Sequence, residues 1–279
     1  MKKFVLGIPN GSLFKRTSEL LGKIGIRVLV NGRNFEAGIE GSDIFKRAYI
    51  MRPQKIPNAI AKGAVDCGIC GWDCVIESRL EAKLRKVMEL SYSKTTGKPV
   101  RIIVFGKKKK FIDEKHISVS SEYINITRSV FKKARIDFSY GSTEVDVLTG
   151  MYDYGICVTE TGRSLEDNGL KIVRIILSSS TVLMAKEDHP AIRFFGQLLL
   201  GALDAERYQL IKMDVSRRIK ERVLSILPAV QSPTVSKLAD DSFAVETAVL
   251  KSETADLIIK LQKLGVRGII AQDINIIIL

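Results

Sequence analysis

The chain has 279 residues, of which 46% are hydrophobic, so it can bury an ordinary core in about two domains. Its net charge is +13, but residues 223–279 carry 5 basic and 6 acidic side chains, and no basic stripe alternates with aromatic residues. These features disfavour a nucleic-acid-binding protein, and the apolar runs are far shorter than the roughly 20 residues that span a bilayer.

Strands and helices alternate through the first half of the chain, as a parallel sheet with crossover helices requires. Ser12 is a possible N-cap of the first helix, and Gly25 follows the end of that helix. The lysine run 107–110 is expected to be a solvated turn between two strands. Strands are predicted at 4–9, 27–30, 49–51, 66–70, 100–105, 117–120, 154–158 and 181–185, and helices at 13–24, 57–62, 74–81, 126–134 and 194–206.

Turn residues at 95–99 predict that the chain leaves one α/β lobe there and enters another. Lobe I is expected to comprise residues 1–98 with a return segment at 181–206, and lobe II residues 99–180. Two lobes joined in this way form a cleft like that of type II periplasmic binding proteins, in which ligands sit at the carboxyl ends of strands.

A separate unit is predicted at 207–279. Its element order is βαββαβ, the ferredoxin-like pattern, and small modules of this kind often bind a regulatory ligand. We expect the second helix to be capped by Ser252 and to end at Gly265. The predicted strands are 208–213, 234–238, 243–250 and 268–271 with 274–279 as an edge, and the predicted helices are 215–226 and 253–264.

The most informative segment runs from Gly141 to Leu170. Its apolar strand stops at the polar loop Thr159–Ser164, after which residues 165–168 can open a helix. Hydroxyl groups and the unpaired N–H groups of a helix start would then converge on one spot, which favours phosphate. The simpler interpretation of the same residues is an N-cap and a turn.

The flanks of this loop resemble the signature of the ATP phosphoribosyltransferase family, the first enzyme of histidine biosynthesis. The matching positions are Gly141, Ser142, Glu144, Val145, Asp153, Thr161, Gly162, Asn168, Gly169 and Leu170.

Further blocks resemble the same family in the same order along nearly the whole chain. They include 7–13, 51–57 and 66–73 in the first half. Near the carboxyl end, 227–229, 232–234 and 244–247 resemble the regulatory domain that distinguishes the long form of the enzyme.

The resemblance implies transfer of the phosphoribosyl group of 5-phosphoribosyl 1-pyrophosphate to N1 of ATP, with Mg²⁺ on the pyrophosphate. The implied catalytic residues are Glu144, Asp153 and Asp73. The sugar phosphate would contact Asp153, Thr159, Glu160, Thr161, Gly162, Arg163 and Ser164, and ATP would contact Gly11, Ser12, Arg52, Asp73 and Glu144.

Several of these residues have simpler interpretations. Arg52 can be a surface ion pair, Asp73 a helix N-cap, and Glu144 a solvated carboxylate. Two positions depart from the family pattern, because Asn10 replaces its usual Lys and Cys157 replaces a second acidic residue after Asp153.

The cysteines at 67, 70 and 74 have a spacing that metal sites also show. No fourth ligand clusters with them, and Cys67 and Cys70 lie on a predicted buried strand, so we expect them to be small apolar residues.

Four cysteines without a targeting segment are expected in the reducing cytoplasm, where disulfides are rare. The resemblance also implies feedback inhibition by histidine and a homo-oligomer, dimer or hexamer. The histidine site would be formed by Asp214, Val230, Thr234, Val249 and Gly268, which could instead build subunit contacts. The alternative function is a non-catalytic sensor of histidine or a phosphosugar on the same fold.

Overall fold

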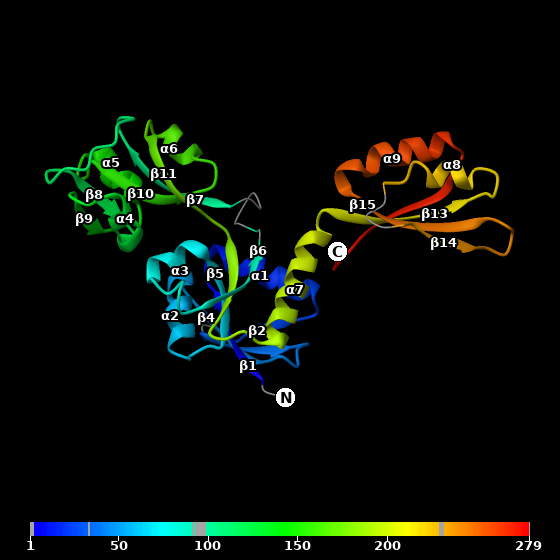
Figure 1. The fold of residues 1–279 in the computed structure, drawn as a ribbon, viewed down its shortest axis with the longest axis horizontal. Coiled ribbons are helices and arrows are strands. Elements are labelled where there is room, and N and C mark those ends of the chain that lie inside the picture. The colour runs from blue at the N-terminus through cyan, green and yellow to red at the C-terminus, as the bar shows by residue number, and fades with distance from the viewer. Residues whose placement is uncertain (1–2, 33, 91, 93–98, 229–231, 279) are drawn as a thin grey trace. The chain divides into compact units, whose positions relative to one another are not determined.

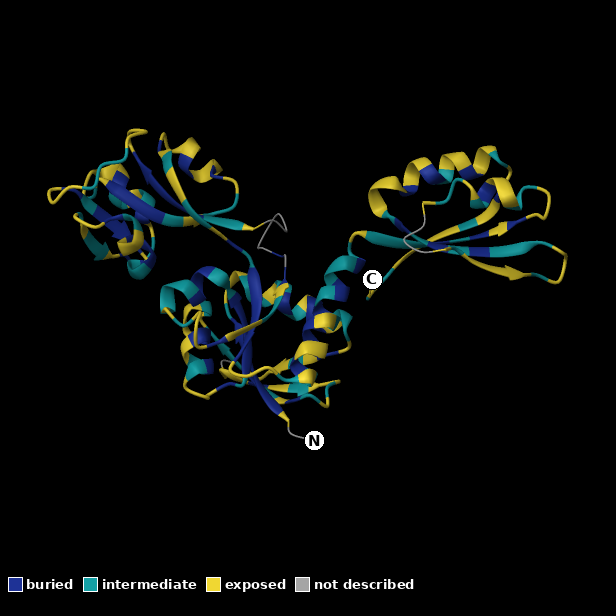
Figure 2. Ribbon diagram, viewed as in Figure 1, coloured by how far each residue is buried: buried dark blue, intermediate teal, exposed yellow. Residues whose placement is uncertain are grey.

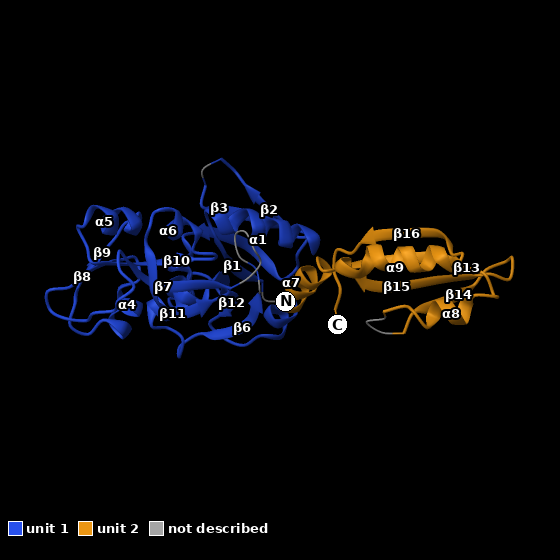
Figure 3. Cartoon of the chain, turned by 90° about the horizontal axis from the view of Figure 1, so that it is seen from above, with its two compact units in different colours: residues 1–196 blue, residues 197–279 orange. Residues whose placement is uncertain are grey.

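The computed structural model describes residues 3–278 apart from 33, 91, 93–98 and 229–231. The chain forms two compact units, residues 1–196 and 197–279, shown in separate colours in Figure 3. The predicted turn at 95–99 falls almost entirely on residues outside the described ranges.

The first unit contains a seven-stranded sheet in the order β2-β3-β4-β1-β5-β12-β6. Its centre is parallel, since β1 pairs with both β4 and β5, whereas β12 runs antiparallel to β5 and β6. The strands are β1 (Phe4–Pro9), β2 (Arg27–Val30), β3 (Glu36–Glu40), β4 (Phe45–Met51), β5 (Cys67–Gly71), β6 (Arg85–Leu90) and β12 (Thr181–Ala185).

Buried residues are concentrated along the central strands of this sheet (Figure 2). Every residue of β1 and β12 is buried, so helices cover both faces of the centre, as parallel strands require. The helices are α1 (Ser12–Lys23), η1 (Pro53–Lys55), α2 (Ile56–Ala61), α3 (Trp72–Ser78) and α7 (Pro190–Ala205), the last of which spans the unit boundary. Gly68 admits the close approach of α2, because a Cβ there would lie 2.6 Å from Ile56 Cγ2.

A five-stranded sheet in the order β11-β7-β10-β8-β9 completes the first unit (Figure 1). Strands β10, β8 and β9 are parallel, and β7 is antiparallel to both β10 and β11. The elements are β7 (Val100–Gly106), β8 (Ser118–Ser121), α4 (Ile124–Val130), β9 (Arg135–Phe138), α5 (Thr143–Thr149), β10 (Tyr154–Thr159), α6 (Arg163–Asp167) and β11 (Lys171–Ser179).

The second unit has the βαββαβ order predicted for it, with a four-stranded antiparallel sheet in the order β14-β15-β13-β16. Both helices contribute to one core that includes Val223, Leu257 and Leu261. The elements are β13 (Tyr208–Val215), α8 (Lys220–Leu224), β14 (Thr234–Lys237), β15 (Phe243–Leu250), α9 (Lys251–Lys263) and β16 (Arg267–Asp273).

Some local expectations were wrong. The first helix starts at Ser12 itself, with Gly11 as N-cap at φ 70°, a conformation that a residue without Cβ adopts at little cost. Likewise α9 begins at Lys251 after Leu250, so Ser252 is inside the helix and caps nothing.

Two further elements of the second unit differ from expectation. The helix predicted at 215–226 reduces to Lys220–Leu224, because β13 continues to Val215 in register with β15. The terminal sheet strand ends at Asp273, and residues 274–278 add no further edge. The lysine run 107–110 is an exposed bend between β7 and β8, as predicted.

Candidate active site

The ends of parallel strands from both sheets of the first unit border one cavity of about 580 Å³. Because parallel strands end at the same edge of a sheet, the segments after β1, β4 and β5 lie together, and so do those after β8 and β10. The cavity is lined by Ser12, Leu13, Pro53, Gln54, Gly71, Asp73, Cys74, Tyr92, Val100, Tyr123, Val158, Thr159, Glu160, Thr161, Arg163, Ser164, Ser179, Ser180 and Thr181.

The loop after β10 is shaped by its own threonines. Thr159 Oγ1 accepts a hydrogen bond from the Gly162 N–H at 2.9 Å, and Thr161 Oγ1 accepts one from the Arg163 N–H at 3.3 Å. Gly162, at φ +86°, turns the chain into α6. From β7, Arg101 donates to the Thr161 carbonyl at 3.4 Å. The loop is therefore pre-formed, and Arg163 lines the cavity.

Asp73, on the helix after β5, is a buried carboxylate whose two hydroxyl partners come from the five-stranded sheet. Ser179 donates to Oδ1 at 2.6 Å, and the Tyr123 hydroxyl donates to Oδ2 at 3.0 Å. Ser179 Oγ also accepts the Asp73 N–H at 2.9 Å. Burial, together with the adjacent Asp73 charge, holds the pKa of Tyr123 well above its usual range, so the phenol stays a donor.

Two further carboxylates, Glu122 and Glu144, follow the ends of β8 and β9. Burial and the charge of Glu144 raise the pKa of Glu122, while the guanidinium group of Arg52 lowers it. Burial raises the pKa of the Cys157 thiol to about 12, and Glu144 and Glu122 add to this effect. Arg52, Glu122, Glu144 and the neutral thiol of Cys157 therefore interact electrostatically, and they are called here the rim cluster; none of the four lines the cavity.

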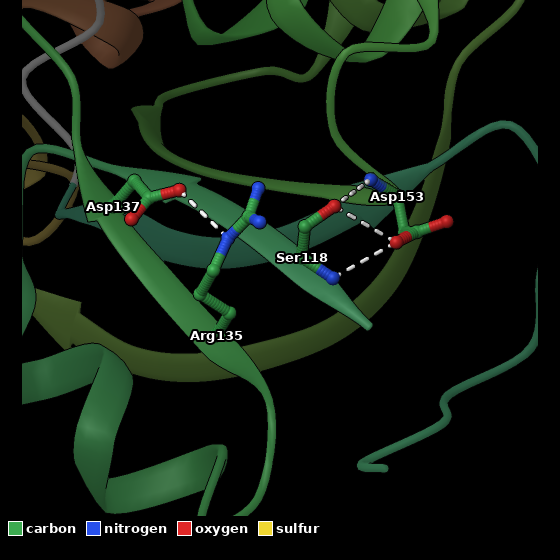
Figure 4. Close-up of polar contacts among 4 residues, drawn as sticks. All are labelled: Ser118, Arg135, Asp137 and Asp153. Carbon is green, nitrogen blue, oxygen red and sulfur yellow. Dashed lines mark hydrogen bonds and ion pairs between the residues drawn. The ribbon is translucent and has the colours of Figure 1, made fainter. Parts of the chain in front are cut away.

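Asp153 lies apart from the loop Thr159–Ser164. It precedes β10 whereas the loop follows that strand, which separates them by about 20 Å at 3.3 Å per residue. Its Oδ2 accepts hydrogen bonds from the N–H and hydroxyl of Ser118 at 2.8 and 2.9 Å (Figure 4). On the neighbouring strand β9, Arg135 pairs with Asp137 (Figure 4). Asp153 thus fastens β8 to β10 at the end of the sheet remote from the loop.

The remaining residues suggested for the first unit occupy two turns. Gly11 is the N-cap of α1, beside cavity-lining Ser12, and Arg52 is the exposed N-cap of η1, beside cavity-lining Pro53. Gly162 itself does not line the cavity, but its neighbours on both sides do.

In the second unit, the structure describes four of the five residues suggested for histidine binding. Asp214 and Gly268 adjoin, since a Cβ on Gly268 would lie 3.2 Å from Asp214 Oδ2. Thr234 is exposed at the start of edge strand β14, whereas Val249 is buried in the core. Val230 lies outside the described residues.

Sequence reasoning missed Glu122, Tyr123 and the segment 179–181. The signal for the first two was available, because they directly follow a predicted strand of the parallel sheet. Residues 179–181 had no such signal in the sequence. They line the cavity because the chain passes there from β11 of one sheet to β12 of the other.

The cysteines at 67, 70 and 74 are buried, and burial raises the pKa of each thiol. Over the described ranges, no group of three or more His, Cys, Asp or Glu side chains is arranged to hold a metal ion. Within the same ranges, no helix has the length and apolar character needed to cross a bilayer.

Comparison with known proteins agrees with this geometry. Residues 52–199 match the family model of ATP phosphoribosyltransferase, and residues 205–276 match that of the HisG C-terminal domain. The chain is 35% identical to the ATP phosphoribosyltransferase of Chlorobium phaeovibrioides, over 97% of this chain and 96% of the relative. Identity to the Desulforudis audaxviator enzyme is 34%, over 99% of both.

A solved structure, the ATP phosphoribosyl transferase (HisG:HisZ) complex from Thermotoga maritima, contains a chain with the same fold. It is 24% identical at a TM-score of 0.59, and the match covers 72% of this chain and 98% of that one. The predicted α/β core with a ferredoxin-like carboxyl-terminal unit is thereby confirmed. The chain belongs to the ATP phosphoribosyltransferase family.

Proposed function

We propose that this protein transfers the phosphoribosyl group of 5-phosphoribosyl 1-pyrophosphate to N1 of ATP, releasing pyrophosphate, as the first committed step of histidine biosynthesis. The observation that carries the proposal is the single cavity that collects the family's motif loops from both sheets. Its volume suits small ligands.

The loop Thr159–Ser164 is proposed as the anchor of the sugar 5-phosphate. Its threonine oxygens accept N–H bonds within the loop, which leaves their hydroxyl hydrogens to donate to an anion. Arg163 adds positive charge at the wall, and a guanidinium group can bind phosphate through two parallel hydrogen bonds. Gly162 supplies the turn that brings these groups together.

The chemistry requires positioning more than covalent participation. When N1 of adenine displaces pyrophosphate at C1 of the ribose, positive charge develops on the sugar, and nearby carboxylates stabilise it. We assign this role to Glu144 together with Glu122, and we assign Arg52 to a phosphate of the nucleotide. Gly11 and Ser12 remain proposed contacts of ATP.

Two carboxylates receive different roles from those that the motif implied. Asp73 is proposed to position Tyr123 and Ser179 at the cavity, since both its oxygens already accept hydrogen bonds. Asp153 is left out of the proposed site because it lies at the remote end of β10.

Mg²⁺ is proposed to bind mainly through the pyrophosphate. Mg²⁺ keeps several bound waters, so it needs only one or two carboxylates from the protein when it binds through the pyrophosphate. Glu122 and Glu144 of the rim cluster could supply these carboxylates. Bound there, the metal would neutralise the leaving group.

Residues 207–279 are proposed as a regulatory domain that binds histidine, with Asp214 pairing the ligand's amine or imidazolium and Gly268 leaving room beside it. Val249 is buried and is not proposed as a contact. A homo-oligomer, dimer or hexamer, is proposed on the family resemblance alone, and a cytoplasmic location is proposed because all four cysteines are free.

The test is to mix the protein with ATP, Mg²⁺ and phosphoribosyl pyrophosphate, remove pyrophosphate enzymatically, and follow phosphoribosyl-ATP with and without histidine. The variant Arg163→Ala is expected to raise the KM for the sugar about tenfold with little effect on the KM for ATP. The matched control is Arg174→Ala, whose guanidinium group covers Phe111. Histidine binding without product would favour the sensor instead.

A further inference from the structure

Glu77, on α3, supplies the missing cap of α4. Its Oε1 accepts the Asn125 N–H and its Oε2 the Ile126 N–H, both at 2.9 Å. In return, Asn125 Nδ2 donates to the Glu77 carbonyl at 2.7 Å. The N-cap residue of α4, Tyr123, offers no side-chain cap, so the orphan N–H groups of the first turn depend on a carboxylate from another segment.

These three hydrogen bonds, called here the clamp, join the two sheets of the first unit. Helix α3 follows β5 of the seven-stranded sheet, and α4 follows β8 of the five-stranded sheet (Figure 1). The chain itself connects the sheets between β6 and β7 and through Ser180, between β11 and β12. The clamp therefore adds a non-covalent attachment to the covalent ones.

The clamp adjoins two residues of the cavity wall. Asp73 and Glu77 are four residues apart on α3 and so share one face of the helix. Their partners are also adjacent, because Tyr123, which bonds Asp73, directly precedes α4. A movement of α4 away from Glu77 would thus also carry Tyr123 away from Asp73.

We propose that Glu77 is a positioning residue that fixes the separation of the two cavity walls. Its kinetic consequence rests on the proposed function, since the residues proposed for ATP and those proposed for the sugar come from opposite walls, whose separation decides whether both substrates can bind together. When the clamp opens, only a fraction of molecules is binding-competent, and apparent affinity falls by that fraction.

The primary test measures wall separation without any substrate. Spin labels are attached at the exposed positions Lys62→Cys and Lys133→Cys, which place one probe beside each sheet. Cys157→Ser removes the one native cysteine that is not buried, so the labels react only at the two introduced sites. Double electron–electron resonance is expected to give a narrow distribution of distances between the two spin labels. Glu77→Gln is expected to broaden this distribution. An unchanged distribution would overturn the proposal.

The second arm uses kinetics on the full chain without labels. Glu77→Gln is expected to raise the KM of ATP and of phosphoribosyl pyrophosphate together, by about tenfold, with kcat within about twofold. The charge-matched control Glu81→Gln, in the exposed turn after α3, is expected to change neither. A purely structural cap would lower kcat and melting temperature with both KM values intact, which contradicts the proposal. Wild-type protein without turnover would refute the proposed function, while the distance measurement still decides the clamp.

Discussion

Removing the Asp73 carboxylate should destabilise the first unit strongly. In Asp73→Ala, the hydroxyls of Tyr123 and Ser179 lose the acceptor they bond at 3.0 and 2.6 Å. These two residues are only 5% and 1% exposed, so water replaces the lost acceptor poorly. A buried polar group left unpaired costs about 1–3 kcal/mol, which gives a total of about 2–6 kcal/mol. Domains are stable by about 5–15 kcal/mol, so the loss is a large fraction.

The chain contains a single tryptophan, Trp72, directly before Asp73, and its fluorescence reports on this site. Urea unfolding followed by that signal is expected to show a lower midpoint for Asp73→Ala at an unchanged m-value. Asp73→Asn should fall between the wild type and Asp73→Ala, because one amide oxygen still accepts a hydrogen bond. Tyr123→Phe removes one hydroxyl and should lose about 1 kcal/mol.

The result that refutes this reasoning is an unfolding free energy of Asp73→Ala within about 0.5 kcal/mol of the wild type, the range of an ordinary surface substitution. If such a variant were also inactive, the carboxylate would act on substrate, as the motif alone implied. A double-mutant cycle with Tyr123→Phe supplies an independent check, with an expected coupling of about 0.5–3 kcal/mol.

Three further predictions concern stability and reactivity. Gly155→Ala would place a Cβ 2.1 Å from the Phe105 ring and should lower the free energy of unfolding, measured in urea, by about 1–3 kcal/mol. Gly22→Ala, in open space on α1, should raise the free energy of unfolding by about 0.5–1 kcal/mol. Burial alone would raise the pKa of Asp113, but three backbone N–H bonds outweigh it and hold that pKa below its usual value. Its stabilisation is present above the ordinary carboxyl pKa and is lost as pH falls through the lower pKa of the folded state. The urea-midpoint gap between wild type and Asp113→Asn should therefore close as the pH falls below the ordinary carboxyl pKa. With a pKa of about 12, Cys157 should react with iodoacetamide at pH 8 about a thousandfold more slowly than an ordinary thiol, measured by mass spectrometry.

The sequence predicted best those elements whose signal is local. Strands 4–9, 27–30, 181–185 and 243–250 have the predicted bounds, because apolar β-branched runs between turn residues specify them without help from the rest of the fold. The loop after β10 was likewise visible, since Gly162 needs a positive φ that few other residues adopt.

Elements that depend on their neighbours were not visible. Strands β3, β6 and β11 mix charged and apolar residues and lie at or near sheet edges, where pairing partners more than propensity decide the structure. The same limit applied to Asp153, which the motif associates with the loop by sequence proximity. Residues that a motif groups together can lie at opposite ends of an extended strand. The length of the predicted strand, at about 3.3 Å per residue, could have shown this separation.

The rim cluster shows how the departure at Cys157 can be compatible with function. The resemblance places an acidic residue at this position, but here the side chain packs against a small core that includes Val147 and Leu165. A third carboxylate beside Glu122 and Glu144 would be disfavoured by burial and by repulsion between like charges. The neutral thiol avoids both, and the negative charge that we propose to stabilise the sugar then comes from Glu122 and Glu144. Because the pKa of Glu122 is already raised, this charge should fall as the pH becomes mildly acidic, before an ordinary glutamate is protonated. The rate of phosphoribosyl transfer should therefore fall as the pH is lowered through the raised pKa of Glu122. In Glu122→Gln, this fall should be absent from the pH profile of the rate.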